Sequence, residues 1–133
     1  MLSKKMPARL ESLPELLAFT AGLAEKNGFA PPARQRIELV VEEALVNVFT
    51  HAYKKTAGDV EIRCVTAAEG TLTIEIRDSG VSFNPLGYAA PNLHADLAHR
   101  KIGGLGVFFI RQMTNQLTYR REGTINSLTL TFF

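Results

Sequence analysis

A carboxylate and an amide lie one helical turn apart in this chain, at Glu43 and Asn47. A spacing of four residues places both side chains on one face of a helix. Magnesium prefers hard oxygen ligands, so the amide oxygen of Asn47 suits a magnesium ion that takes its other ligands from a polyphosphate and water. Glu43 would then lie near the terminal phosphate, where a carboxylate orients or deprotonates a water or a substrate hydroxyl. The plainer alternative for such a pair is a solvated helix side.

Two glycine-containing segments follow, Asp78-Ser79-Gly80 and Gly103-Gly104-Leu105-Gly106. A carboxylate at Asp78 can accept a hydrogen bond from an exocyclic amine such as that of adenine, and Gly80 lets the backbone approach a flat ring. The second segment precedes a helical pattern, and free N–H groups at a helix start attract phosphate. Taken singly, the first segment is also typical of a strand-ending turn and the second of a flexible or packing turn. The order and spacing of all three segments together predict a nucleotide site.

Other polar residues near these segments have weaker roles. His51 lies one turn beyond Asn47, and we interpret it as a cleft wall or a helix-end polar contact rather than a catalytic group. Arg100 and Lys101 could reach a terminal phosphate if their loop closes, with solvated surface as the alternative. The chain has neither the P-loop sequence nor the dinucleotide-binding fingerprint, and no Cys/His spacing in it suits zinc.

The predicted helices follow from the spacing of apolar residues. The strongest covers residues 33–53, where an apolar stripe recurs at a period of 3.6. Glu43 and Asn47 lie at the edge of that stripe, so we expect both to be partly buried and to face a cleft. An earlier helix begins after Ser12, an expected N-cap, and ends at Asn27-Gly28.

Strands are predicted where apolar and polar residues alternate. Residues 60–66 and 72–76 read as an antiparallel hairpin whose second strand runs directly into Asp78. Residues 117–121 and 126–133 read as a closing hairpin, and residues 3–9 form at most an edge strand.

The order of elements predicts the fold class. A loop over residues 84–102 is long enough to be functional or mobile, and a helix follows Gly103. The order is then strand, helix, helix, hairpin, loop, helix, hairpin. Because helices and strands are largely segregated, we expect a two-layer α/β sandwich, with helices over one face of a mixed, mostly antiparallel sheet.

Length and composition set the remaining bounds. With 133 residues the chain predicts a single domain over 1–133. A hydrophobic fraction of 46% is typical of a soluble protein, and a net charge of +2 is too small to indicate nucleic-acid binding. Cys64 is the single cysteine, interpreted as a small buried apolar residue. The sequence lacks an apolar run of ~20 residues and a secretory signal, so we expect a cytoplasmic protein without membrane contact.

The three segments resemble the sequence boxes of the GHKL-type (histidine-kinase-like) ATPases. The closest resemblance is to their small branch of anti-sigma factor serine/threonine kinases, the RsbW and SpoIIAB type. Residues 43–47 are similar to the N box, which His51-Ala52-Tyr53 continues. Residues 78–85 are similar to the first glycine box, and residues 103–110 to the second. The similarity covers nearly the whole chain and implies a Bergerat-type ATP-binding fold.

The resemblance also implies roles for single residues. Glu43 would be the catalytic base, Asn47 would ligate Mg²⁺, and Asp78 with Gly80 would recognise adenine. Phosphates would be bound by the second glycine segment, through Gly104, Gly106 and the neighbouring backbone amides of Gly103 and Leu105. Residues 86–102 would form a lid over ATP.

The activity implied by the resemblance is transfer of the γ-phosphate of ATP to a serine or threonine of a STAS-class antagonist protein. The same kinase would bind a sigma factor, commonly as a homodimer. A nucleotide-dependent binding or switch module with little phosphotransfer is an alternative from a different functional class. A third interpretation, an α/β interaction domain that binds no nucleotide, makes no use of the three boxes.

Overall fold

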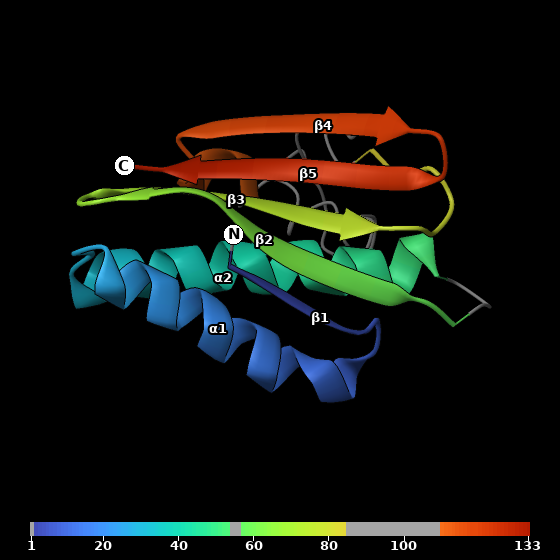
Figure 1. The fold of residues 1–133 in the computed structure, drawn as a ribbon, viewed down its shortest axis with the longest axis horizontal. Helices are drawn as coiled ribbons and strands as arrows, with labels where there is room; N and C mark the ends of the chain where they lie inside the picture. Colours follow the sequence, from blue (N-terminus) through green and yellow to red (C-terminus); the bar gives the residue numbers. More distant parts are fainter. Residues whose placement is uncertain (1, 54–56, 85–109) are drawn as a thin grey trace, which may run out of the picture.

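The computed structural model describes residues 2–53, 57–84 and 110–133, and their strands form one sheet (Figure 1). The strands are β1 (Ser3–Pro7), β2 (Asp59–Ala68), β3 (Thr71–Asp78), β4 (Gln116–Glu122) and β5 (Ile125–Phe132). Their order in the sheet is β1-β2-β3-β5-β4. Each described strand pair is antiparallel, so the expected mostly antiparallel sheet is confirmed.

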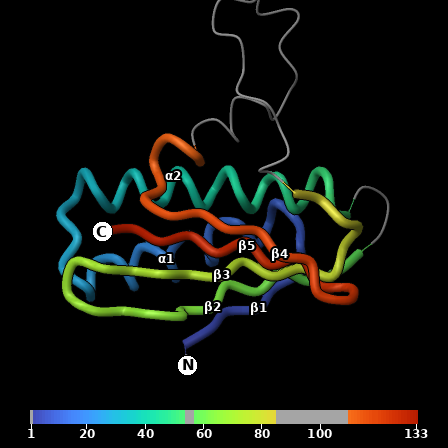
Figure 2. The backbone as a smooth tube through the Cα atoms, turned by 90° about the horizontal axis from the view of Figure 1, so that it is seen from above, coloured from blue at the N-terminus to red at the C-terminus, as the bar shows by residue number. Residues whose placement is uncertain are grey.

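The helices lie on one face of this sheet, which makes the two-layer α/β sandwich expected from the sequence (Figures 1 and 2). They are η1 (Leu10–Ser12), α1 (Leu13–Lys26), α2 (Pro31–Asn47) and η2 (Val48–Ala52). Residues 110–113 are also helical. None of the helices in the described part of the chain is both long and apolar enough to cross a membrane.

Helix α1 has a hydrogen-bonded side chain at its C-terminal end and none at its N-terminal end. Ser12 occupies the N-cap position as expected, but its side chain makes no capping hydrogen bond. At the other end the Asn27 side chain donates from Nδ2 to the Leu23 carbonyl at 2.7 Å, and Gly28 follows with φ of 83°. A residue with positive φ ends a helix, and glycine adopts that conformation without steric cost.

The second helix differs from the prediction at its C-terminal end. The predicted helix over 33–53 begins at Pro31, and its α-helical part ends at Asn47. The next five residues form the π-helical turn η2, in which the Tyr53 amide donates to the Val48 carbonyl at 3.3 Å. Wider turns of this kind change the direction of the side chains that follow and are frequent at functional sites.

The apolar stripe of α2 packs against the inward side chains of the sheet. Fully buried residues of that stripe include Ile37, Val40, Val41 and Leu45. Inward residues of β2, β3 and β5 complete the core, among them Ile62, Ile74, Ile76, Leu130 and Phe132. Cys64 is buried in the same layer, which confirms its interpretation as a small apolar residue.

The other face of the sheet is polar. Thr73 and Thr131 share a hydrogen bond of 3.0 Å across β3 and β5, and Arg63 lies 3.5 Å from Glu75. No helix of the described residues covers this face (Figure 2). The alternation of apolar and polar residues along the strands therefore separates a buried face from a hydrated one.

Strand register decides which residues meet at the end of the sheet. Asp78, the last residue of β3, is paired with Asn126 near the start of β5. Arg121 of β4 is paired with the same asparagine. The turn between β2 and β3 lies at the opposite end, where the Gly70 amide donates to the Asn27 carbonyl at 2.8 Å.

Replacing Leu45 by Ala tests the packing of α2 on the sheet. Leu45 is fully buried in the core, so Leu45→Ala should lower the free energy of unfolding by about 2–5 kcal/mol. Leu39→Ala, on the exposed side of the same helix, is the matched control and should cost at most about 1 kcal/mol. Urea denaturation measures both, and equal losses would contradict this orientation of the helix.

Candidate functional site

Asn47 lies at the end of α2 with its side chain turned toward the sheet. The residue is 6% exposed, and its Nδ2 is the one buried side-chain nitrogen or oxygen in the described part of the chain without a hydrogen-bond partner. Leaving a buried amide nitrogen unpaired costs roughly 1–3 kcal/mol. The structure thus buries Asn47 more deeply than the partial burial expected from the sequence, and it leaves the amide available to a ligand.

Glu43 lies one turn before Asn47 on α2 and is partly buried. Burial raises the pKa of its carboxyl above the usual value, and the neighbouring charge of Glu42 raises it further. A carboxylate with a raised pKa is a stronger base, which suits a group that accepts a proton near neutral pH.

Asp78 is the buried acidic group at the end of β3. Its Oδ1 accepts hydrogen bonds from the Gly80 amide at 2.9 Å and from Asn126 Nδ2 at 2.8 Å. Within the described residues both hydrogen bonds to this carboxylate reach Oδ1, which leaves Oδ2 as an acceptor for a ligand.

The ionisation of Asp78 is set by opposing effects. Burial raises the pKa of the Asp78 carboxyl, whereas the hydrogen bonds from Asn126 and Gly80 and the charge of Arg121 lower it. Burial is the largest effect, so the net pKa is above the usual value. The two donors on Oδ1 favour the carboxylate form, which can accept but not donate a hydrogen bond.

Asn126 connects Asp78 to the rest of this end of the sheet. It is 3% exposed, and its Nδ2 donates to the Val81 carbonyl at 2.8 Å as well as to Asp78. Its Oδ1 accepts hydrogen bonds from the Tyr119 hydroxyl at 2.6 Å and the Phe83 amide at 3.5 Å. Both amide hydrogens and the amide oxygen of this buried side chain are therefore satisfied.

The segment after Asp78 is held on both sides. The Gly80 carbonyl accepts a hydrogen bond from Arg121 Nη1 at 2.8 Å, and the Val81 amide donates to the Ala52 carbonyl at 3.0 Å. A Cβ at position 80 would lie 2.4 Å from that Ala52 oxygen, so only glycine lets the backbone come this close. Gly80 thus joins the first glycine segment to the end of the helix that carries Glu43 and Asn47.

A small cavity lies between α2 and the sheet, lined by Asn47, Asp78, Phe83, Tyr119 and Asn126 among others. Its volume is about 20 Å³, enough for about one water molecule. Phe83 also stacks on His51 with ring centroids 4.6 Å apart. His51 does not line the cavity itself and contacts it through Phe83, so its interpretation as a cleft wall stays a prediction. A flat ligand would need the aromatic side chains that line the cavity to move.

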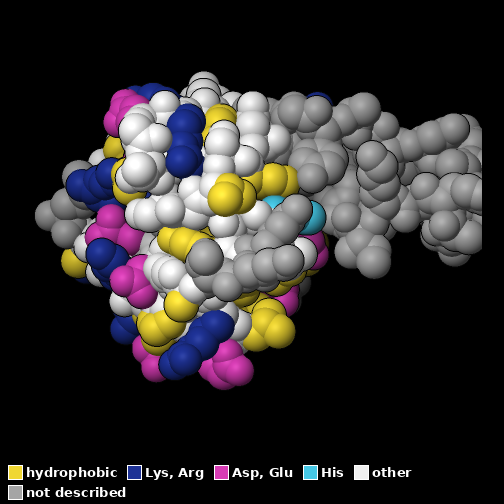
Figure 3. All heavy atoms as spheres, turned by 90° about the vertical axis from the view of Figure 1, so that its right-hand side faces the viewer, with side chains coloured by type: hydrophobic (Ala, Val, Ile, Leu, Met, Phe, Trp, Pro, Cys, Tyr) yellow, Lys and Arg dark blue, Asp and Glu magenta, His cyan; other side chains and the backbone are white. Residues whose placement is uncertain are grey.

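A larger cavity of about 470 Å³ opens near the same end of the sheet, lined by Tyr53, Asp78 and Ser79 and by charged residues of both signs, including Lys5, Glu61 and Arg77. It is lined by none of the residues of α2. On the end of the molecule shown in Figure 3, basic side chains are interspersed with acidic ones and form no continuous basic patch among the described residues.

The structure brings together one part of the predicted site. Asn47 and Asp78 line one cavity, Glu43 lies one turn away, and Gly80 packs on the same helix end. The remaining predicted residues, Arg100, Lys101, Gly103, Gly104, Leu105 and Gly106, lie outside the described residues, as does the predicted lid over 86–102.

Sequence reasoning missed three residues of this site. Asn126 is a polar residue on the inward face of a strand whose next inward residues are apolar, and that break in the pattern was the available signal. Tyr53 and Arg121 gave no such signal, because their partners, Ser79 and Gly80, lie far away in the sequence.

Comparison with known proteins agrees with this geometry. A family profile described as a histidine kinase-like ATPase domain matches residues 6–132. The serine-protein kinase RsbW of Bacillus mycoides is 28% identical over 120 residues, covering 87% of this chain and 74% of that protein. The protein of the same name from Bacillus cereus (strain AH187) gives the same identity and coverage.

Solved structures with a similar fold come from a blue-light activated histidine kinase of Erythrobacter litoralis. Its histidine kinase domain matches 90% of this chain with a TM-score of 0.56 and 19% identity, and this chain spans 60% of it. A second structure of that kinase matches 90% of this chain with a TM-score of 0.54 and 21% identity, and this chain spans 41% of it. At these identities the likeness supports the fold alone.

Replacing Asp78 by Asn tests the cost of burying its charge. The pKa of this carboxyl is raised on folding, so its ionisation destabilises the folded state at any pH above the raised value. Asp78→Asn keeps the shape and an acceptor oxygen, and it should therefore raise the free energy of unfolding at pH 7. The gain should shrink as the pH falls through the raised pKa and vanish below the unfolded value near 3.8, where the wild-type group is neutral.

Urea denaturation at pH 7 and in acid measures this difference. Glu69→Gln, at an exposed position on the far turn, controls for the removal of one negative charge. A variant that is less stable than the wild type at pH 7 would refute the assigned direction of the pKa shift.

Proposed function

This chain belongs to the histidine kinase-like ATPase domain family, and from that premise we propose that it is an ATP- and magnesium-dependent protein serine/threonine kinase. The proposal extends to its role: an anti-sigma factor that phosphorylates a small STAS-type antagonist. Relatives at 28% identity that carry the name serine-protein kinase RsbW support this choice within the family. The further expectation of a homodimer comes with the same resemblance.

The proposal depends on one observation, the unpartnered amide of Asn47 beside the acidic end of β3. The buried Asn47 Nδ2 without a partner costs stability, and a ligand oxygen that accepts a hydrogen bond from it recovers that cost. Asp78 lines the same cavity. The donor set therefore fits a ligand with an amine at one end and charged oxygens at the other, as in ATP with Mg²⁺.

Asn47 is the residue that would hold the magnesium ion. Among the described residues there is no group of three His, Cys, Asp or Glu side chains that could hold a metal by themselves. Magnesium commonly keeps several waters and takes phosphate oxygens as ligands, so a single amide oxygen is sufficient protein ligation. The ion would supply positive charge beside the phosphates.

Asp78 would select the base. With Oδ1 occupied by Gly80 and Asn126, Oδ2 accepts a hydrogen bond from the exocyclic amine of adenine, and a carbonyl at that position of the ring would instead meet a second acceptor. Because the cavity is now about 20 Å³, binding requires displacement of its aromatic wall, of which Phe83 is part. Gly80 would support this contact by holding the segment after Asp78 against the Ala52 backbone, where a Cβ has no room.

Glu43 would act as the general base on the acceptor hydroxyl. It is one helical turn from Asn47, so it lies toward the phosphate end of the site when the base is at Asp78. Its raised pKa brings the carboxylate closer to the pH at which it must accept a proton. The phosphate contacts of Arg100, Lys101, Gly103, Gly104, Leu105 and Gly106 remain part of this proposal.

A binding or switch module of the same fold without significant phosphotransfer is the alternative. Incubation with labelled ATP and a candidate STAS-domain protein separates the two functions. Label on a serine or threonine of that protein supports the kinase, and tight ATP binding without label transfer supports the switch. Absence of any heat of binding in calorimetry with Mg-ATP would exclude both.

Asn47→Ala should weaken Mg-ATP binding about tenfold, because it removes the proposed protein ligand of the ion, a contact to a charged group worth roughly 1.5 kcal/mol or more. Calorimetry with Mg-ATP, and with ATP plus a chelator, measures the effect. The difference from the wild type should disappear in the chelator. Gln35→Ala removes an exposed amide from the same helix as control; equal affinity of Asn47→Ala and the wild type in magnesium would contradict the assignment.

Glu43→Ala should leave ATP affinity largely intact and slow phosphotransfer by more than about 100-fold, the lower range for loss of a general base. Transfer of label to the partner protein at saturating ATP measures the rate. Glu38→Ala, a partly buried carboxylate five residues earlier on α2, is the control. Undiminished turnover of Glu43→Ala would rule out its role as base.

A further inference from the structure

We propose that Tyr53 is a positioning residue for the base-binding segment 79–81, and that its hydroxyl fixes this segment to the end of the helix that carries Glu43 and Asn47. The inference rests on the proposed function, because its effect on activity is read through nucleotide binding. Tyr53 itself lines the larger cavity rather than the small one, so it acts through Ser79 and not by touching the base.

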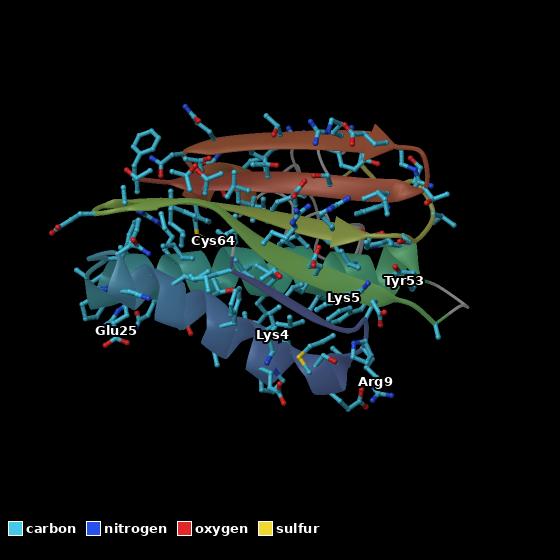
Figure 4. The ribbon with its side chains drawn as sticks, viewed as in Figure 1. Lys4, Lys5, Arg9, Glu25, Tyr53 and Cys64 are labelled. Carbon is cyan, nitrogen blue, oxygen red and sulfur yellow. The ribbon has the colours of Figure 1, made fainter. Side chains whose placement is uncertain are left out.

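Tyr53 is the residue immediately after the π-helical turn, and it is 9% exposed. Its hydroxyl accepts a hydrogen bond from the Ser79 amide at 2.7 Å and donates one to the Asp59 carbonyl at 2.9 Å. One phenol therefore joins the end of the helix to the start of β2 and to the residue after β3. Figure 4 shows Tyr53 at this junction, beside the start of β2.

The chain makes room for this ring at Gly58. A Cβ at position 58 would lie 2.2 Å from Cε1 of Tyr53, closer than carbon atoms can approach. The Gly58 carbonyl is in turn bonded to the Ala8 amide at 2.8 Å, which holds the segment before β2 against the end of β1. The position of the Tyr53 ring is thus fixed by the backbone at Gly58, which its hydrogen bond to Ala8 holds in place.

The bonds of segment 79–81 divide into two sets. Arg121 and Asn126 hold the Gly80 and Val81 carbonyls to the sheet. The helix side is held by the Ala52 carbonyl and the Tyr53 hydroxyl. Among the described residues, Tyr53 is the side chain that ties this segment to the helix, and together with the Ala52 carbonyl it holds Asp78 at its distance from Asn47.

A fixed separation matters because the two residues are expected to hold opposite ends of one ligand. If segment 79–81 is already ordered before ATP binds, binding carries no free-energy cost for ordering it. The affinity for ATP is then higher. Loss of the hydroxyl should therefore raise the Kd and KM for ATP while leaving kcat almost unchanged, since Glu43 is not displaced. A purely structural role would instead lower the amount of folded protein and leave the KM of the folded fraction unchanged.

The experiment compares Tyr53→Phe with Thr20→Val and the wild type. Both variants remove a buried hydroxyl, and the Thr20 hydroxyl donates to the Leu16 carbonyl at 3.0 Å within α1, far from segment 79–81 in the sequence. Three quantities are measured: hydrogen exchange of the Ser79 amide without nucleotide, the Kd for Mg-ATP, and the split between KM and kcat.

In Tyr53→Phe the exchange rate of the Ser79 amide and the Kd for Mg-ATP should each rise about fivefold, as expected for one lost hydrogen bond of roughly 1 kcal/mol. In Thr20→Val both quantities should equal those of the wild type. Gly58→Ala, which displaces the ring while keeping the hydroxyl, provides a second route to the same changes if Tyr53→Phe does not fold.

Unchanged Ser79 exchange in both Tyr53→Phe and Gly58→Ala would overturn the proposed linkage. Faster Ser79 exchange with unchanged Kd and KM would overturn the positioning role while leaving the proposed function intact. Failure of the wild type itself to bind Mg-ATP would overturn the proposed function, and the exchange measurement would still report on the linkage.

Discussion

Burial of the Asp78 carboxylate is the constraint on which this end of the molecule depends. A charge taken out of water is tolerated only where hydrogen bonds and a nearby opposite charge compensate it. Here the compensation comes from Gly80, Asn126 and Arg121, that is, from the next loop and from two other strands. The antiparallel register of β3, β5 and β4 makes that possible, because it aligns Asp78, Asn126 and Arg121 at one end of the sheet.

The same end of the fold also contains two groups that lower the stability of the folded state. Asp78 is held with a raised pKa, and the Asn47 amide is buried without a partner. Costs of this kind are typical of sites that are shaped for a ligand, and the apolar core beneath α2 offsets them. If every polar group of the site already had a hydrogen-bond partner, a ligand would gain less binding free energy there.

Much of the fold could be predicted because its signals are periodic. The stripe of α2 repeats over several turns and the strands alternate cleanly, so both elements and the sandwich itself follow from the sequence. The π-helical turn at Val48–Ala52 could not be predicted, since five residues are too few to show a different period. The side-chain cap expected at Ser12 is absent, because this serine ends the preceding 3-10 helix with helical φ and ψ and lacks the extended backbone of an N-cap.

The site was predictable where one segment carries its own chemistry. The Glu43 and Asn47 pair and the Asp78 turn depend only on local spacing, and the structure places Asn47 and Asp78 on one cavity. Asn126 and Tyr53 work through residues 48 and 26 positions away. Their roles depend on strand register and on the direction of the chain after α2, neither of which is visible in the order of residues.

The two ends of the sheet are fastened by different kinds of bond. The end near the small cavity is joined by one backbone hydrogen bond, from the Val81 amide to the Ala52 carbonyl, and otherwise mainly by side chains, each of which one codon change can remove. At the opposite end the amide of Gly70 meets the carbonyl of Asn27, a link between backbone groups that depends on no side chain, although Gly28 and Gly70 have the positive φ that favours glycine. Apart from these two glycines, substitutions should therefore be tolerated far more freely around the β2–β3 turn than beside the small cavity, although both ends keep the two layers together.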